Sequence, residues 1–425
     1  MLIIYRLLTI FFYPLLILII FIRKFFNKED FIRYKEKIFP EKSLLNKNVQ
    51  KKLIWFHSAS IGETQSIIPL IKRFIKYDQE IDILITTITL SSGKLISQKF
   101  KNNKNIKHRY LPLDLNFLAN RFLYNWEPDI ALFVDSEIWP NLLQEIKKRN
   151  IPLILLNGRI TNRTFSKWSL IPSTAKKIFN LFDLCLIANK ETKKYLLEFN
   201  ARNIKDIGNI KFATRYEFDK KISDNKNFST KKNIWCAVST HKGEEEFIIK
   251  THLKLKVVHD SITTIIIPRH IKRIKNIESI CRKYNVKFQI LSEKEKIRIG
   301  NEIIIVNSYG RVSEYLKLCD SVFIGKSLLK KLKSDGGQNP IEAAKLGCKI
   351  YHGPYVYNFE EIYKLLSKYK IAEQITSEIN LFQKLKTDFD KKIKIKNENA
   401  IKNINQLGEK ILENTFQQLK GYIKK

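Results

Sequence analysis

The sequence lacks the patterns that bind a structural metal or build a disulfide framework. Its five cysteines are isolated from one another, with no C-x-x-C pair. This spacing argues against a zinc site and suits a reducing compartment. The seven histidines show no H-E-x-x-H spacing, which a helical zinc site would need. We therefore predict no structural metal and no cofactor.

Two nucleotide-binding fingerprints are also missing. The chain has neither G-x-x-x-x-G-K-[ST] nor G-x-G-x-x-G, so it matches neither a nucleoside triphosphatase nor a dinucleotide-binding protein. Sequence-level repeats are absent too.

Acidic residues are scarce compared with basic ones. There are 42 Asp and Glu against 77 Lys and Arg, which gives a formal net charge of +35. A field of this sign attracts polyanions, either nucleic acid or an anionic membrane surface. Part of the lysine excess is expected to lie on solvated faces.

An apolar run opens the chain. Residues 2–22 are apolar except for Arg6 and a break at Pro14, and the uninterrupted part is slightly shorter than the ~20 residues that span a bilayer. The run predicts a membrane anchor over residues 1–25, either a signal anchor or a helix that dips into one leaflet; a buried core helix is the alternative. No small-residue cleavage site follows it. The basic stretch behind it predicts that most of the chain is cytoplasmic.

Beyond the anchor, the length of 425 residues suggests two domains. Short apolar runs alternate with helical patterns, which is typical of a parallel sheet wound with helices. We expect two Rossmann-like domains that face each other across a cleft: residues 26–214, a linker at 215–232, and residues 233–425 with a helical tail. The expected strands are Leu53–Phe56, Ile81–Thr87, Tyr110–Leu113, Ile130–Val134, Leu153–Leu156 and Leu184–Ala188, then Ile234–Val238, Thr263–Ile267, Phe288–Leu291, Ile303–Val306, Ser321–Ile324 and Lys349–Tyr351.

The first of these strands leads into a stretch that could carry chemistry. A small, turn-forming segment, Ser58–Gly62, separates it from a helical pattern that starts at Thr64. Glu63 would then lie in the first turn of a helix at the carboxyl edge of the sheet, where open α/β sheets bind ligands. Ser60 and Glu63 also match the S-x-x-E capping box, in which the carboxylate only satisfies backbone N–H groups. Both interpretations stay open on spacing alone.

Two more polar clusters belong to the first half. Asp135–Asn141 follows a predicted strand and suggests sugar recognition or the orienting of a charged partner, although Asp135 or Ser136 could simply cap a helix. Lys211, in the segment GNIKF, precedes the linker. It is either a residue near the interdomain cleft or an ordinary solvated lysine.

In the second half, three clusters suit a phosphate. Ser239–Glu244 offers hydroxyls and backbone N–H groups, or a capped turn. Arg269 ends a strand, and its planar fork fits phosphate oxygens. Gly336–Glu342 predicts a helix N-terminus that presents amides to a phosphate, with Glu342 accepting hydrogen bonds from a ribose or capping the helix. A carboxylate in one half and an anion site in the other predict a nucleotide-sugar glycosyltransferase.

Taken together and in this order, several segments carry a family resemblance: WFHSASIGE, SEIWPNLL, NGRIT, GNIKF, STHKGEEE, IPRH and GGQNPIEAAKLG. The set resembles the 3-deoxy-D-manno-octulosonic acid (Kdo) transferases of lipopolysaccharide assembly. The resemblance implies an α/β fold of the GT-B type, with CMP-Kdo as donor and a lipid A precursor as acceptor. It also implies an inverting transfer at the cytoplasmic face of the bacterial inner membrane, where the basic surface would meet an anionic leaflet.

The same resemblance implies roles for individual residues. Glu63 would be the proton acceptor, and Glu137 and Lys211 would stabilise the transition state. The CMP-contacting positions would be Pro268, Arg269, Tyr309, Gly310, Arg311, Asn339, Pro340, Ile341 and Glu342. The chain departs from the family at Gln338, where His is usual, and in the longer, more basic loop Lys326–Asp335.

Two alternatives are kept. One is a GT-B transferase that uses another nucleotide sugar. The other is a membrane-tethered basic protein that binds nucleic acid without catalysis; it would need aromatic residues interleaved with Lys and Arg, and the sequence shows no such module.

Overall fold

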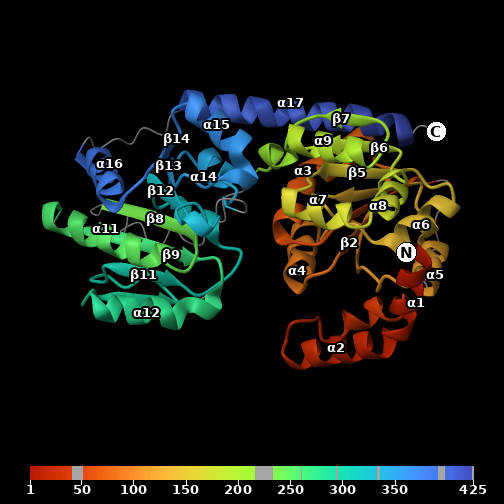
Figure 1. Cartoon of the computed structure of the whole chain (residues 1–425), viewed down its shortest axis with the longest axis horizontal. Helices are drawn as coiled ribbons and strands as arrows, with labels where there is room; N and C mark the ends of the chain where they lie inside the picture. Colours follow the sequence, from red (N-terminus) through yellow and green to blue (C-terminus); the bar gives the residue numbers. More distant parts are fainter. Residues whose placement is uncertain are drawn as a thin grey trace. The chain divides into compact units, whose positions relative to one another are not determined.

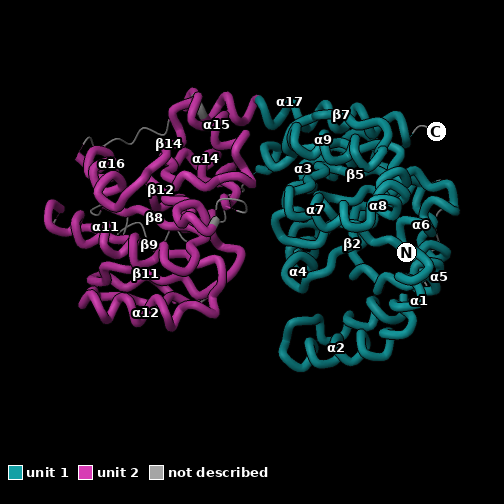
Figure 2. Tube along the Cα trace, viewed as in Figure 1, with its two compact units in different colours: residues 1–215, 407–425 teal, residues 216–406 magenta. Residues whose placement is uncertain are grey.

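The computed structural model describes residues 1–40, 51–215, 233–259, 261–292, 295–332, 336–390 and 398–423. The chain divides into two compact units (Figure 2): unit 1 is Met1–Arg215 with Leu407–Lys425, and unit 2 is Tyr216–Gln406. The predicted linker, apart from Arg215, lies outside the described residues.

Unit 1 is built on a seven-stranded parallel sheet of order β3-β2-β1-β4-β5-β6-β7 (Figure 1). Helices accompany both faces, so the central strands β1, β4 and β5 are buried along their whole length. The strands are β1 (Leu53–Ser58), β2 (Asp82–Thr87), β3 (Ile106–Tyr110), β4 (Ile130–Val134), β5 (Leu153–Gly158), β6 (Leu184–Ile187) and β7 (Ile204–Asp206). The helices are α3 (Ile61–Tyr77), α4 (Leu90–Lys99), α5 (Asn116–Trp126), α6 (Pro140–Lys148), α7 (Asn162–Ser169), α8 (Pro172–Phe179) and α9 (Lys190–Glu198), with the 3-10 turn η2 (Ile210–Ala213).

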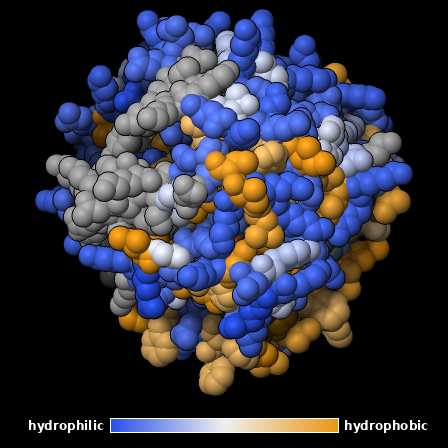
Figure 3. Space-filling model, turned by 90° about the vertical axis from the view of Figure 1, so that its left-hand side faces the viewer, coloured by the Kyte–Doolittle hydropathy of each residue, from blue (hydrophilic) through white to orange (hydrophobic). Residues whose placement is uncertain are grey.

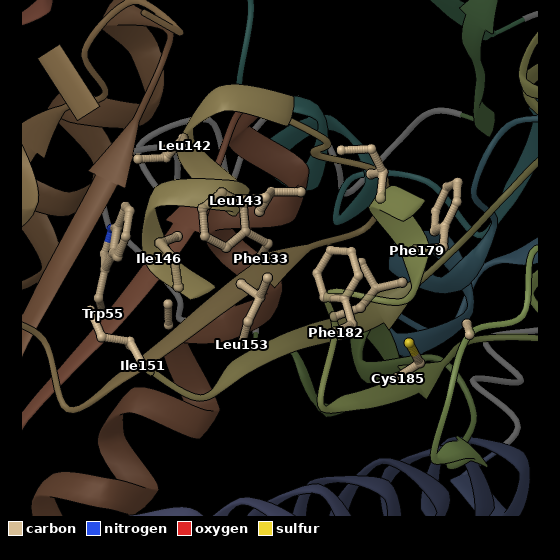
Figure 4. Close-up of a cluster of buried hydrophobic side chains, with 14 of the residues drawn as sticks. Trp55, Phe133, Leu142, Leu143, Ile146, Ile151, Leu153, Phe179, Phe182 and Cys185 are labelled. Carbon is tan, nitrogen blue, oxygen red and sulfur yellow. The ribbon is translucent and has the colours of Figure 1, made fainter. Parts of the chain in front are cut away.

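The core on one side of this sheet is aromatic. Trp55 and Phe133 from neighbouring strands are fully buried and meet edge to face, with ring centroids 5.3 Å apart. Leu143 and Ile146 of α6 and Phe179 of α8 belong to the same cluster (Figure 4). This packing fixes the ends of β1 and β4 against each other.

Strand order locates the crevice of unit 1. The chain runs from β1 outward to β2 and β3 and then returns to β4 on the other side of β1. In open α/β sheets, ligands bind outside the carboxyl ends of the strands at this kind of switch point. The turns after β1 and β4 therefore meet where a ligand would lie.

Unit 2 repeats the design, with a seven-stranded parallel sheet of order β10-β11-β9-β8-β12-β13-β14 and its switch point between β8 and β12. The strands are β8 (Asn233–Thr240), β9 (Ile262–Pro268), β10 (Phe288–Leu291), β11 (Ile303–Val306), β12 (Ser321–Ile324), β13 (Lys349–His352) and β14 (Ala372–Gln374). The helices are α11 (Glu244–Val258), α12 (Ile274–Lys283), α13 (Val312–Leu316), α14 (Ile341–Lys345), α15 (Glu360–Lys368) and α16 (Glu378–Asp390).

One predicted strand was misplaced and two were missed. The strand expected at Tyr110–Leu113 is in fact β3, which ends at Tyr110; it is an edge strand whose charged residues alternate with apolar ones, while Pro112 cannot donate to a ladder. The missed strands, β7 and β14, are three residues each and partly exposed. Such short polar edge strands carry no apolar run to detect.

The helical tail corrects the predicted domain boundary. From Leu407 on, α17 (Glu398–Ile423) belongs to unit 1, not to the second domain. Phe416 contacts Phe74 in a tilted arrangement with ring centroids 5.0 Å apart, and Glu413 pairs with Arg73 at 3.1 Å. The apolar stripe of the tail is therefore buried against α3.

The N-terminal run folds as two helices, α1 (Leu2–Phe11) and α2 (Tyr13–Phe25), bent by 57°. Pro14 is the second residue of α2, in the first helical turn, where its missing N–H removes no helical hydrogen bond. No single described helix is long and apolar enough to cross a membrane, while the bent pair could do so by length and composition only. The buried-helix alternative is wrong, because Leu7 and Phe11 are 62% and 75% exposed. Figure 3 shows hydrophobic side chains at its lower edge, at the height where Figure 1 draws α2.

Candidate functional site

Glu63 completes a capping box. Helix α3 begins after Ser60, whose Oγ accepts the Glu63 N–H at 3.3 Å. In return, Glu63 Oε2 accepts the N–H of Ala59 at 2.8 Å and of Ser60 at 3.4 Å, while Ser60 Oγ donates to Oε1 at 2.7 Å. The capping interpretation is confirmed. It fixes the carboxylate at the carboxyl end of β1.

The surroundings make Glu63 more basic than an ordinary carboxylate. Burial raises its pKa, and the negative charges of Asp135 and Glu137 raise it further, against the hydrogen bonds from Ser60 and Ala59. A base needs a pKa that brings it toward the working pH. The cap and the two acidic neighbours together give a fixed carboxylate that can take a proton.

Glu137 lies in the turn after β4 and is held from two sides. Its Oε2 accepts the indole N–H of Trp139 at 3.1 Å and faces His57 Nε2 at 3.4 Å. His57 is fully buried at the end of β1, and its Nδ1 lies 2.9 Å from Thr86 Oγ1. Thr86 Oγ1 also accepts the Trp55 indole N–H at 2.9 Å, so the threonine hydroxyl links the Trp55 and His57 side chains.

Lys211 is not the solvated lysine that its sequence context allowed. Its side chain is 15% exposed, and its Nζ lies 2.9 Å from Asp135 Oδ2. Asn209 Oδ1 accepts the Lys211 backbone N–H at 3.0 Å and so shapes the turn η2. Unit 1 thus gathers Glu63, Glu137 and Lys211 around one further residue, Asp135.

In unit 2, the segment Ser239–Glu244 forms a capped turn instead of an open anion cradle. Glu244 is fully buried and accepts the N–H groups of His241, Lys326, Ser327 and Leu328 at 2.8 to 3.1 Å. The carboxylate therefore already uses amides that a phosphate would need. Its effect is to tie the loop after β12 to the start of α11.

The predicted phosphate-binding arginine is available on the surface. Arg269 follows Pro268 at the end of β9, and its backbone N–H donates to Thr240 O at 3.1 Å, while its side chain is exposed. Tyr309 is also exposed, at 58%.

Arg311 differs, because its guanidinium pairs with Glu314 at 2.6 Å. Gly310 has a φ of +81°, which only glycine adopts readily.

Glu342 lies in the first turn of α14. The cap differs slightly from the prediction: Pro340 is the N-cap, and Asn339 Oδ1 accepts the Ile341 N–H at 3.1 Å. Burial raises the pKa of Glu342 to about 7, against a hydrogen bond from Ser313. The side chain can therefore accept or donate a hydrogen bond near neutral pH.

Comparison with known proteins gives the family. The profile described as "3-Deoxy-D-manno-octulosonic-acid transferase (kdotransferase)" matches residues 29–214. The chain is 30% identical to the 3-deoxy-D-manno-octulosonic acid transferase of Rickettsia bellii, over 95% of both chains. The chain belongs to the Kdo transferase family. It is also 28% identical to the Kdo transferase of Haemophilus influenzae, over 76% of each chain.

Solved structures support the fold of this Kdo transferase. A UDP-GlcNAc 2-epimerase from Neisseria meningitidis matches with a TM-score of 0.58 at 11% identity, over 88% of this chain and 99% of that one. A glycosyltransferase from Rickettsia africae matches with a TM-score of 0.56 at 13% identity, with the same coverage. Likeness at this identity shows the fold alone. The predicted GT-B fold, the family and the enzyme class are confirmed, and membership of a glycosyltransferase family argues against the nucleic-acid-binding alternative.

Sequence reasoning missed how the site of this Kdo transferase is held together. Asp135 stood in a recognised cluster, yet its pairing with a lysine 76 residues away has no local signal. Asn157, which hydrogen-bonds Asp135, lies in the segment NGRIT that carries part of the resemblance. In the part of the chain that the structure describes, no group of three or more His, Cys, Asp or Glu could hold a metal ion.

Proposed function

We propose that the chain transfers Kdo from CMP-Kdo to a lipid A precursor, with inversion at the anomeric carbon. The observation that carries the proposal is the group in unit 1: a capped carboxylate, Glu63, with a raised pKa, together with Glu137 and the buried ion pair of Lys211. This group lies at the switch point of the sheet, where a ligand is expected. It belongs to a chain of the Kdo transferase family.

The reaction needs one proton acceptor. A hydroxyl of the acceptor attacks the anomeric carbon of Kdo while the bond to the phosphate oxygen of CMP breaks, and that oxygen leaves with the electron pair. The hydroxyl proton passes to the Glu63 carboxylate, a general-base step. The carboxylate of Glu137 stabilises positive charge that develops on the sugar ring, and the Lys211 ammonium stabilises negative charge. A single displacement of this kind inverts the anomeric carbon.

Unit 2 is proposed to bind the CMP part of the donor. Its contacts would come from Pro268, Arg269, Tyr309, Gly310, Arg311, Asn339, Pro340, Ile341 and Glu342. Arg269 is the cation for the phosphate, because its guanidinium is exposed at the carboxyl end of β9. Glu342 would accept hydrogen bonds from the ribose hydroxyls.

Arg269→Ala tests the donor site. A charge-assisted hydrogen bond is worth roughly 1.5–3 kcal/mol, so we expect the Kd for CMP to rise by about 10- to 100-fold, measured by calorimetry. Arg282→Ala is the matched control, because Arg282 is an exposed arginine of the same unit whose partner is Glu278 on its own helix. An unchanged Kd in Arg269→Ala would remove this residue from the donor site.

The activity itself is tested by incubating the protein with a lipid A precursor and CMP-Kdo. The mass of the product is then measured by mass spectrometry. A mass increase by one or more Kdo units, with release of CMP, supports the proposal and counts the units added. Transfer from a UDP-sugar with release of UDP would favour the alternative GT-B transferase instead.

We also propose that the protein works at the cytoplasmic face of the inner membrane, with the bent helix pair in one leaflet. Both ends of the pair are held by unit 1. Near the start, the Tyr5 hydroxyl donates to Asp114 at 2.8 Å. After the end, buried Glu29 pairs with Arg23 at 2.6 Å and with Lys37 at 2.5 Å, and the Lys37 ammonium donates to Ile88 O at 2.9 Å, which ties this segment to the loop after β2. A segment tied at both ends to one unit is expected to dip into the bilayer and return.

Leu7→Glu with Phe11→Glu tests this membrane site. Burying a large apolar side chain is worth roughly 1.5–3 kcal/mol, so we expect the double variant to bind anionic vesicles at least about tenfold more weakly in a sedimentation assay. Val257→Glu is the control, because Val257 is 86% exposed on α11 of unit 2. Equal vesicle binding by the double variant and the control would contradict the proposed attachment.

A further inference from the structure

Asp135 occupies a conformation that the reaction described so far does not explain. It follows β4 directly and has a φ of +59°, in the left-handed region that aspartate tolerates better than most residues. Its backbone N–H donates to Leu156 O at 3.0 Å, and its carbonyl accepts the Arg159 N–H at 3.2 Å. These two backbone hydrogen bonds fix the turn to the neighbouring strand β5 and the residues after it. In this conformation the Asp135 side chain points toward Lys211.

Both carboxylate oxygens of Asp135 are used. Oδ2 lies 2.9 Å from Lys211 Nζ, and Oδ1 accepts the Asn157 side-chain N–H at 2.6 Å. The Asp135 side chain is 14% exposed, so this ion pair is largely removed from water. Breaking such a pair by removing one partner is costly, because it leaves the other charge buried and unpaired.

Asn157 joins the two segments that carry the pair. It sits at a β-bulge, where the register of β5 shifts between Leu156 and Gly158, and it has a φ of +54°. Its Nδ2 donates to Asp135, and its Oδ1 accepts the Ile210 N–H at 2.9 Å, directly before Lys211. Bulges often re-aim a side chain next to an active site. Here one buried amide fixes the turn after β4 and the turn η2 against each other.

We propose that Asp135 is a positioning residue of the transfer reaction, which holds the Lys211 ammonium at the carboxyl edge of the unit 1 sheet and places a fixed negative charge near Glu63. The inference rests on the proposed function, in which Glu63 is the base and Lys211 stabilises charge. It adds a residue to which that function gives no role. The ion pair fixes the position of the Lys211 ammonium, and the negative charge of Asp135 makes the nearby Glu63 carboxylate more ready to accept a proton.

The charges around Glu63 determine the direction in which each substitution should shift its pKa. The turn after β4 contributes Asp135 and Glu137, both of which raise the pKa of Glu63. Strand β1 contributes His57, which faces Glu137, and η2, which packs against α3, contributes Lys211. Removing the charge of Asp135 should therefore lower the pKa of Glu63. Removing the charge of Lys211 leaves Asp135 unpaired and should raise it.

The test is the dependence of kcat/KM on pH, whose acid limb reports the base of the free enzyme. Asp135→Asn keeps a residue that accepts positive φ, and we expect its acid limb to move to lower pH by roughly half a unit or more, with a lower kcat. Lys211→Gln is expected to move the acid limb to higher pH. A merely structural role would lower kcat in both variants without moving the limb, and that result would overturn the inference.

Two comparisons sharpen the test. Asp206→Asn makes the same charge change at an exposed position of β7, and its pH profile should match that of the unaltered protein. In the double variant, Asp135→Asn should reduce kcat less on the Lys211→Gln background than alone, because the two residues act as a unit; fully multiplicative losses would contradict positioning. A failure of the proposed function itself would give a different result. Glu63→Gln would then retain turnover, whatever the pH profiles of the Asp135 and Lys211 variants show.

Discussion

Glu63→Gln is expected to slow Kdo transfer by roughly 10²–10⁴-fold, the usual contribution of a positioned general base. Glutamine has the shape of glutamate but cannot take the hydroxyl proton. Because a glutamine also completes the capping box, the N–H groups of Ala59 and Ser60 keep an acceptor. The loss should therefore be chemical, with a change in the free energy of unfolding below about 1 kcal/mol.

Three measurements separate this outcome from a folding defect. Turnover is followed by release of CMP, the affinity for CMP is measured by calorimetry, and the melting temperature is recorded. Glu198→Gln is the control, since Glu198 is an exposed glutamate at the end of α9. Normal turnover by Glu63→Gln would exclude it as the base. Because burial and two carboxylates raise its pKa, activity should fall with decreasing pH sooner than an ordinary glutamate would predict.

Local patterns were enough to predict the part of the site that Glu63 occupies. The apolar run of β1, the small residues after it and the S-x-x-E spacing are all neighbours in sequence, and the structure follows them. Both interpretations of Glu63 also turned out to be compatible, because the cap places the carboxylate at the sheet edge. A capping interaction is therefore no argument against a catalytic role.

Contacts across long stretches of sequence could not be predicted in the same way. The Asp135–Lys211 pair depends on how the turn after β4 and the turn η2 meet, which is decided by the sheet and by the bulge at Asn157. The tail shows the same limit, since its apolar stripe does not say which unit covers it. Phe416 can contact Phe74 only after α3 has packed on the sheet, so the sequence of the tail alone does not indicate this contact.

The buried carboxylate of Glu244 gives the second large expected effect, on stability. It follows β8 and accepts four backbone N–H groups, those of His241, Lys326, Ser327 and Leu328. Burial raises the pKa of Glu244, and these four donors act against that rise. Glu244→Gln would turn an NH₂ group toward two of the donors. The cost is about 2–4 kcal/mol, as for other buried groups that lose a charged partner.

Hydrogen exchange is the measurement that isolates this effect, because a two-unit chain need not unfold in one step. We expect the amides of Ser327 and Leu328 to exchange at least about 30-fold faster in Glu244→Gln, since their protection reports local opening. Glu246→Gln is the matched control two residues away. The Glu246 carboxylate lies at the surface, where its partners are the side chains of Lys283 and Tyr284. Equal protection in both variants would show that other contacts hold the loop after β12. Faster exchange in Glu244→Gln alone, with weaker CMP binding, would show that one buried carboxylate shapes the edge of unit 2 where the donor is proposed to bind.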